Sequence, residues 1–196
     1  AEANLAGFKQ TSNFYKDVEA LCKVMNIHVH PALRPVLWEV EKPIVPEGED
    51  AKEPEEKPVT VVKFDRHRLD KNTLKALFHL IPQSQVRTVK FSNNGITPEQ
   101  FDKIIEYLYQ TPALSTVFFD WNPLYKEDFR DLGKDEEILY QRGEEEESKF
   151  VKFVSEGSRI KILFLRGNNL DDEDVKQMCE ALKNPTPLKV IDISYN

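Results

Sequence analysis

Apolar residues recur along the chain in a fixed pattern. Within each copy they stand at offsets 0, 3, 5 and 10 from the first residue, and a small polar residue stands at offset 8. The clearest copy has Val86, Val89, Phe91 and Ile96 around Asn94. Repetition at a constant spacing predicts one structural unit that is stacked several times. The copies begin at residues 59, 86, 114, 160 and 188.

The second half of each copy has the apolar spacing of a helix. Its apolar residues stand at offsets 5, 8, 9 and 12 from the last position of the first half, and these offsets share one helical face. After Ile96, Thr97 can cap such a helix and Pro98 suits its first turn. Each unit is therefore predicted to be a short strand, a turn and a helix. In the second copy the helical face consists of Phe101, Ile104, Ile105 and Leu108.

The copy that begins at residue 114 is 46 residues long, which is an insertion of 18 relative to its 28-residue neighbours. The normal end of its helix returns at Phe150, so the extra residues are placed at about 133–149, on the helix side. This segment holds seven acidic and three basic residues. Insertions in repeat proteins often mark contacts. A solvated acidic loop is an equally good interpretation.

Residues 59–196 resemble the leucine-rich repeat family, in particular its ribonuclease-inhibitor-like subtype with 28-residue repeats. The resemblance implies an α/β solenoid, which is an arc with a parallel sheet on its concave side and helices on its convex side. Asparagine at offset 8 suits this fold, because its side chain can bond to backbone groups of neighbouring turns. His67 replaces asparagine in the first copy, and we interpret it as a structural substitute in an atypical first repeat.

The residues before the repeats form two further segments. Residues 1–40 are predicted to be an N-terminal helical cap or docking segment, and residues 41–58 an acidic, proline-rich linker. Ser12 or Asn13 can cap the helix. Residues 14–37 are also similar to the head region of some ciliary leucine-rich repeat proteins. The helical stripe consists of Phe14, Val18, Leu21, Cys22 and Met25.

Two pairs of residues in the chain are candidates for reactivity or metal binding. Cys22 and Cys179 each lie on an apolar helical stripe, so we expect both to be buried hydrophobic residues rather than nucleophiles. His28 and His30 could in principle hold a metal ion, but two ligands make a poor site, and a loop or cap contact is the better interpretation. The sequence therefore predicts no metal site.

Charge is distributed unevenly over the 196 residues. The net charge is −7, and residues 41–58 and 133–149 each contribute −4, so the rest of the chain sums to +1. Such a body offers no broad basic face for nucleic acid or anionic lipid. No apolar run approaches the roughly 20 residues of a membrane span. Two distant cysteines fit a reducing compartment. We therefore expect a cytoplasmic protein, and the ciliary resemblance implies a cytoskeletal location.

The chain has no glycine-rich phosphate loop, zinc-ligand spacing or nucleophile elbow. We therefore predict a protein that is not an enzyme, with no catalytic residue and no cofactor. One alternative stays open. Some leucine-rich repeat proteins activate GTPases by presenting an arginine on an acidic surface, and Arg66, Arg87 and Arg166 keep this alternative available.

Strand alternation sends the residues at offsets 2, 4 and 7 to the concave surface. Exposed aromatic residues gathered in one place are typical of a binding site. Two alternatives compete: the acidic linker folds back over them, or Trp121 turns toward the hydrophobic layer. Lys63, Arg66 and Lys90 are expected to orient acidic groups of a partner, and Arg166 belongs to the same surface. The predicted anchors are Phe118, Trp121, Ile162, Phe164, Val190 and Tyr195.

These residues predict a non-enzymatic scaffold or adaptor that binds another protein on its concave face. We expect it to be part of a hetero-complex, and the second resemblance implies a ciliary or axonemal assembly. The sequence stops at Asn196 in the middle of a repeat. Because repeat proteins need a polar terminal cap, further repeats, a cap or a partner are expected to follow.

Overall fold

The structure is a computed structural model that describes residues 8–11, 13–33, 59–96, 98–122, 150–155 and 157–196. The predicted linker at 41–58 and the predicted insertion at 133–149 lie outside the described residues, as does Thr97. Within the described part of the chain, no helix is both long and apolar enough to cross a bilayer.

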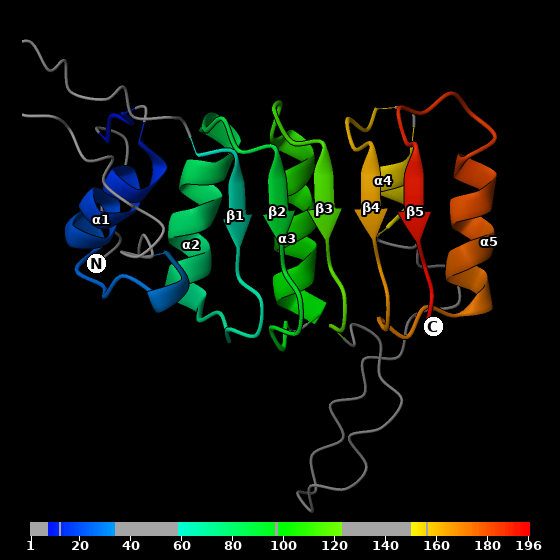
Figure 1. Ribbon diagram of the computed structural model, residues 1–196, viewed down its shortest axis with the longest axis horizontal. Helices are drawn as coiled ribbons and strands as arrows, with labels where there is room; N and C mark the ends of the chain where they lie inside the picture. Colours follow the sequence, from blue (N-terminus) through cyan, green and yellow to red (C-terminus); the bar gives the residue numbers. More distant parts are fainter. Residues whose placement is uncertain (1–7, 12, 34–58, 97, 123–149, 156) are drawn as a thin grey trace, which may run out of the picture.

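One parallel sheet organises the molecule (Figure 1). Its strands are hydrogen-bonded in sequence order, and each begins two residues after a predicted unit start. The register matches equivalent positions, so that Val62, Val89 and Val117 are partners in adjacent strands. The predicted α/β class and the predicted parallel sheet are therefore confirmed. The strands are β1 (Val61–Lys63), β2 (Thr88–Lys90), β3 (Thr116–Phe118), β4 (Ile162–Phe164) and β5 (Val190–Asp192).

The helices form a second layer on one side of this sheet (Figure 1). At the start of α2 and of α5, an aspartate side chain caps backbone amides of the first turn. Asp70 accepts hydrogen bonds from the amides of Asn72 and Thr73, and Asp171 forms a capping box with Asp174. The elements are α1 (Phe14–Met25), η2 (Pro31–Leu33), α2 (Lys71–Leu80), η3 (Ile81–Gln83), α3 (Pro98–Gln110), α4 (Val151–Val154) and α5 (Asp172–Ala181).

The core lies between the two layers. The middle residue of each strand from β1 to β4 is buried, and the residue two positions later is buried as well. At that later position Phe64, Phe91 and Phe119 stack in a column, with ring centroids 5.2 and 5.5 Å apart. Burying each such side chain contributes about 2–3 kcal/mol. The aromatic column therefore joins three consecutive units through their cores.

Each strand ends in the same backbone turn. The residue at offset 7 is left-handed in every unit, with φ between 54° and 63°. Its amide donates to the carbonyl of the next unit, for example from Trp121 to Arg166 at 2.7 Å and from Asn93 to Asp120 at 2.9 Å. This conformation costs free energy for any residue except glycine. The hydrogen bonds between units therefore maintain the turn. The left-handed residues are Arg66, Asn93, Trp121, Gly167 and Tyr195.

The asparagines at offset 8 bond to backbone groups, as the sequence predicts, and Asn94, Asn122 and Asn168 are buried. The amide of Asn94 donates to Oδ1 of Asn122 at 2.9 Å, and Nδ2 of Asn122 donates to the carbonyl of Phe119 at 3.1 Å. Asn168 and Asn196 form the same contact at 2.8 Å. These bonds satisfy polar groups that stacking would otherwise leave unpaired.

His67 departs from this arrangement. Its imidazole is exposed and meets the ring of His30 edge-on, with centroids 5.4 Å apart. The side chain therefore contacts the N-terminal segment and does not substitute for a buried asparagine, so that interpretation was wrong in detail. The reason is its place in the stack, because no earlier strand lies beyond β1 in the described sheet. His30 also lies 3.2 Å from the Arg68 carbonyl, a loop contact of the kind predicted.

The two ends of the stack are covered differently. At the first end α1, capped by Asn13, packs against α2, and Cys22 is buried as predicted. At the other end α5 is the last helix of the row (Figure 1), and Cys179 is exposed. The prediction of a buried Cys179 was wrong, because its helical stripe has no further helix beside it in the described structure.

Candidate functional site

The face of the sheet opposite the helices, which we call the open face, carries the side chains at offsets 2 and 4. The register aligns the residues at offset 4 across all strands. Along this line the first two positions are basic, the next two aromatic and the last acidic. The line consists of Lys63, Lys90, Phe118, Phe164 and Asp192.

Two aromatic rings stack at the centre of the open face. Phe118 and Phe164 are partners in β3 and β4, with ring centroids 4.4 Å apart and planes within 3° of parallel. Lys90 places its Nζ 4.2 Å from the centre of the Phe118 ring. The Arg166 guanidinium lies 5.6 Å from the centre of the Phe164 ring. The stack is therefore flanked by a cation at each end. Each cation is attracted electrostatically to the face of its ring.

Trp121 stands in the turn after β3 and is 47% exposed. It does not turn toward the hydrophobic layer, which removes one of the alternatives. Its indole lies on Gly167, where a Cβ atom would collide with the ring. The ring of Tyr195 lies 5.4 Å away, at 41° to the indole plane. The equivalent residue is left-handed in the other units without being glycine, so glycine is needed at 167 for the close approach of Trp121.

Arg166 is held in place by two carboxylates. Its Nη2 lies 2.7 Å from Oδ2 of Asp120, and its backbone amide donates to Oδ1 of the same residue at 3.1 Å. Its Nε is buried without a hydrogen-bond partner and lies 3.7 Å from Oδ2 of Asp192. The hydrogen bond that its guanidinium donates to Asp120 raises the pKa of Arg166 above its usual value. The guanidinium is therefore a fixed positive group beside the aromatic stack.

The carboxylate of Asp192 is also oriented locally. It accepts hydrogen bonds from the hydroxyl and the amide of Ser194, and these bonds lower the pKa of Asp192 below its usual value. Sequence patterns did not single out Asp120 or Asp192. A usable signal was present, because Asp120 and Arg166 both stand at offset 6 of adjacent units and carry opposite charges.

All ten residues that the sequence proposed lie on or beside the open face, in two parts. Lys63 and Arg66 are exposed at the β1 side, with Lys90 next to them. The apolar residues lie over β3 to β5, where Ile162 and Val190 are partners. We call this second group the aromatic patch. It consists of Phe118, Trp121, Ile162, Phe164, Val190 and Tyr195.

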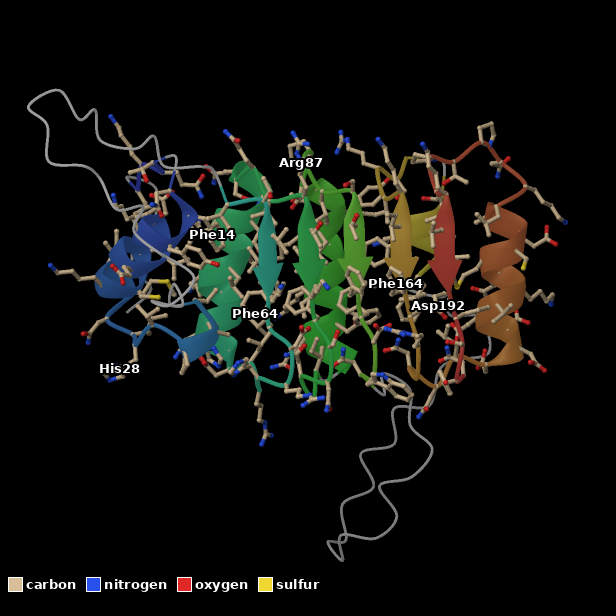
Figure 2. All side chains as sticks on the ribbon, in the orientation of Figure 1. Phe14, His28, Phe64, Arg87, Phe164 and Asp192 are labelled. Atoms are coloured by element: carbon tan, nitrogen blue, oxygen red, sulfur yellow. The ribbon has the colours of Figure 1, made fainter. Side chains whose placement is uncertain are left out.

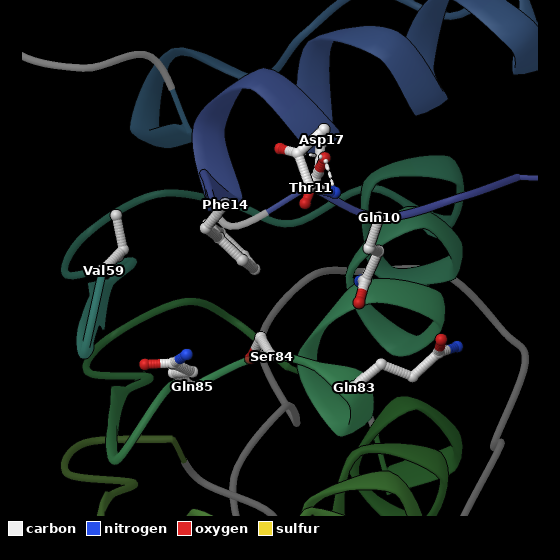
Figure 3. Close-up of a pocket in the computed structure, with 8 residues that line it drawn as sticks. All are labelled: Gln10, Thr11, Phe14, Asp17, Val59, Gln83, Ser84 and Gln85. Atoms are coloured by element: carbon white, nitrogen blue, oxygen red, sulfur yellow. Dashed lines mark hydrogen bonds between the residues drawn. The ribbon is translucent and has the colours of Figure 1, made fainter. Parts of the chain in front are cut away.

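A small pocket lies elsewhere, between the N-terminal segment and the first strand (Figure 3). Its volume is about 90 Å³, well below the roughly 300 Å³ of ligand pockets. Asp17 on its wall already accepts hydrogen bonds from the amide and the hydroxyl of Thr11, both at 2.8 Å. This pocket is therefore a packing gap rather than a candidate site.

Comparison of the chain with models of known protein families gives no match, and comparison with curated proteins gives none either.

Proposed function

We propose that the chain is a non-enzymatic scaffold or adaptor of the leucine-rich repeat type, which binds a partner protein through the aromatic patch. The repeat assignment is supported by the sequential parallel sheet, the left-handed turn in every unit and the buried asparagines. In this proposal the stack curves as a solenoid, and the open face is its concave side. Such faces present one row of side chains from each unit.

The observation that carries the binding proposal is the partly exposed stack of Phe118 on Phe164, with Trp121 held beside it on Gly167. Aromatic side chains are enriched among the residues that dominate binding free energy. Here their rotamers are already ordered, because each ring rests on another group. A partner would therefore bury apolar area at a low cost in side-chain entropy.

The flanking charges support an orientation for the partner. Lys63, Arg66 and Lys90 stand at the β1 side of the patch, and Asp192 stands at the β5 side. Arg166 neutralises part of the acidic side through Asp120. An acidic group of the partner is therefore expected over the lysines, with its apolar residues over β3 to β5.

A cross-linking experiment tests the site. A photo-reactive residue replaces Tyr195 in the aromatic patch, and in a matched protein it replaces Tyr109, an exposed aromatic residue on helix α3. In an extract from the native source, the proposal expects a specific protein adduct from position 195 only. Affinity for that partner should then fall by about 2 kcal/mol or more in Trp121→Ala and in Phe164→Ala. Equal adducts from both positions, or unchanged affinity in both variants, would contradict it.

The GTPase-activator alternative has weaker geometric support. Arg87 precedes β2, whereas Arg66 and Arg166 follow β1 and β4, so the three side chains do not share one edge of the sheet. Arg166 is also occupied by Asp120. Arg66 and Arg87 are both exposed, and Arg66 is the one beside the open face, so it is the arginine that this alternative would use. It predicts faster GTP hydrolysis by a small GTPase, lost in Arg66→Ala, and no stimulation over a panel of GTPases would remove it.

A cytoplasmic location in a ciliary or axonemal assembly is the remaining part of the proposal, and it is supported by the sequence resemblance alone. Fluorescent tagging in the native cell tests it directly. Signal along the cilium would support this location, and its exclusion from the cilium would contradict it.

A further inference from the structure

A second charged feature lies at the edge of the sheet where the strands begin. Arg87, Lys161 and Lys189 stand one residue before β2, β4 and β5, and all three are exposed. Arg159 adds a fourth exposed base close to Lys161. We call these four residues the basic row. Figure 2 shows Arg87 at this edge.

The backbone sets the spacing of the basic row. The amides of Ser115 and Thr116 donate to the carbonyl of Arg87 at 2.9 and 3.0 Å. The carbonyl of Lys161 accepts in the same way from Lys189 at 2.8 Å. Because neighbouring strands are about 4.8 Å apart, the row from Arg87 to Lys189 spans about 14 Å. The charges are therefore carried on a rigid frame, although each side chain is free at its tip.

These charges are not neutralised by the described residues. The described ion pairs involve other bases, namely Arg166, Lys176 and Lys183. Helices α3 and α5 end near this edge, and the partial negative charge of a helix end, about half a charge, offsets only part of a full cation. Within the described part of the chain, the basic row thus presents a positive strip that no acidic side chain pairs.

We propose that the basic row binds an extended acidic segment of a partner protein that runs across the strand ends from β2 to β5. Alternate side chains of an extended segment are about 6.8 Å apart, so three carboxylates on one side of it match the span of the row. A strip one side chain wide on a chain of net charge −7 suits a peptide better than a long polyanion. The site is separate from the proposed function, because it contains no residue of the aromatic patch.

The test uses the full chain and a fluorescent peptide of about ten glutamates, a length that exceeds the 14 Å row when extended. We expect measurable binding that weakens as salt is raised. The double variant Lys161→Glu with Lys189→Glu should weaken it on the order of tenfold. The matched control is Lys75→Glu with Lys103→Glu, which makes the same charge change at exposed positions of α2 and α3. Thermal melts of all proteins establish that each is folded.

Three outcomes would overturn this proposal. One is no binding of the peptide to the folded chain, and another is an equal loss in the control variant. The third is tighter binding of a single-stranded oligonucleotide or an anionic vesicle than of the peptide, which would assign the row to a different class of partner. Phe164→Ala should leave peptide binding unchanged, so failure here and failure of the aromatic patch are distinguishable.

Discussion

Two aromatic stacks run through neighbouring units, one on each face of the sheet. Phe91 and Phe119 stack inside the core, 5.5 Å apart, and both are at most 1% exposed. Phe118 and Phe164 stack on the open face, 4.4 Å apart, and both are partly exposed. Phe118 and Phe119 are consecutive residues. A single step along a strand therefore separates an aromatic residue that stabilises the fold from one that is displayed to solvent.

The surroundings of the two stacks differ as well. The interior stack contacts further apolar groups, such as Phe101 and Phe153. The surface stack is flanked by Lys90 and Arg166. Burial is complete in the first case, so its hydrophobic free energy is already used in folding. In the second case part of the ring area is still hydrated and can be buried by a partner.

The largest expected effect comes from truncating the interior stack. Phe119→Ala removes a fully buried ring that contacts Phe91, Phe101 and Phe153. The free energy of unfolding should fall by about 3–5 kcal/mol, measured by denaturant titration. A loss below about 1 kcal/mol would mean that the interior and surface stacks are equivalent.

The buried asparagines come next. Asn122→Ala removes the acceptor for the Asn94 amide and the donor to the Phe119 carbonyl, both buried. Leaving such groups unpaired should cost about 2 kcal/mol of unfolding free energy. Asn72→Ala, at an exposed helical position, is the control and should be close to neutral. Equal losses in the two variants would show that the hydrogen bonds of the buried asparagines contribute nothing to the unfolding free energy.

The contact of Trp121 with Gly167 is the next feature to test, on the surface side of the sheet. Gly167→Ala forces a side chain into a left-handed position beneath the Trp121 ring, which should cost about 1–2 kcal/mol. Trp38 is the second tryptophan of the chain, so Trp38→Phe leaves Trp121 as the sole source of tryptophan fluorescence. In that background, the fluorescence emission of Trp121 should shift to longer wavelength as its ring leaves that contact. An unchanged spectrum would contradict the seat of Trp121 on Gly167.

A smaller effect is expected at the cap of α2. Burial raises the pKa of Asp70, but hydrogen bonds from Thr73 and Asn72 outweigh it, so its pKa lies below the usual value. The carboxylate therefore stabilises the fold above its unfolded pKa of about 3.9, and this contribution is lost as pH falls through the folded value. Asp70→Ala should cost about 1 kcal/mol at neutral pH. The gap from wild type should close below about pH 4 in pH-dependent melts.

The smallest effect on folding is expected for the surface stack. Phe164→Ala should lower the unfolding free energy by about 0.5 kcal/mol, the usual size of a cross-strand pair contribution. The same variant is expected to lose far more in partner binding. Denaturant titration checks the first value, and a loss as large as that of Phe119→Ala would show that the patch is part of the core.

Much of the fold could be predicted from the chain because its period is local. A strand begins two residues after each predicted unit start, and the apolar residues at offsets 3 and 5 are buried from Val62 to Leu165. The buried positions of Asn94, Asn122 and Asn168 were likewise predictable, since a polar residue within an apolar pattern needs backbone partners.

Other features depended on contacts between distant residues. Arg166 and Asp120 are 46 residues apart, and only their shared offset in adjacent units indicates that they can pair. Cys179 looked buried because it stands on the apolar stripe of α5, yet of that stripe only Met178 is buried, and no helix follows α5 in the described structure to cover Cys179. The repeat pattern predicts the conformation of each unit, but it does not predict which residues cover the first and last units.

The order of the residues alone therefore fixed the strand and turn of each unit, the helices α2, α3 and α5, and the face to which each strand residue points, because these follow from backbone geometry and apolar spacing. Packing between units placed Trp121 on Gly167, held Arg166 between Asp120 and Asp192, and set the N-terminal helix over one end. These contacts join separate units, and their free energy exists only once the units have stacked.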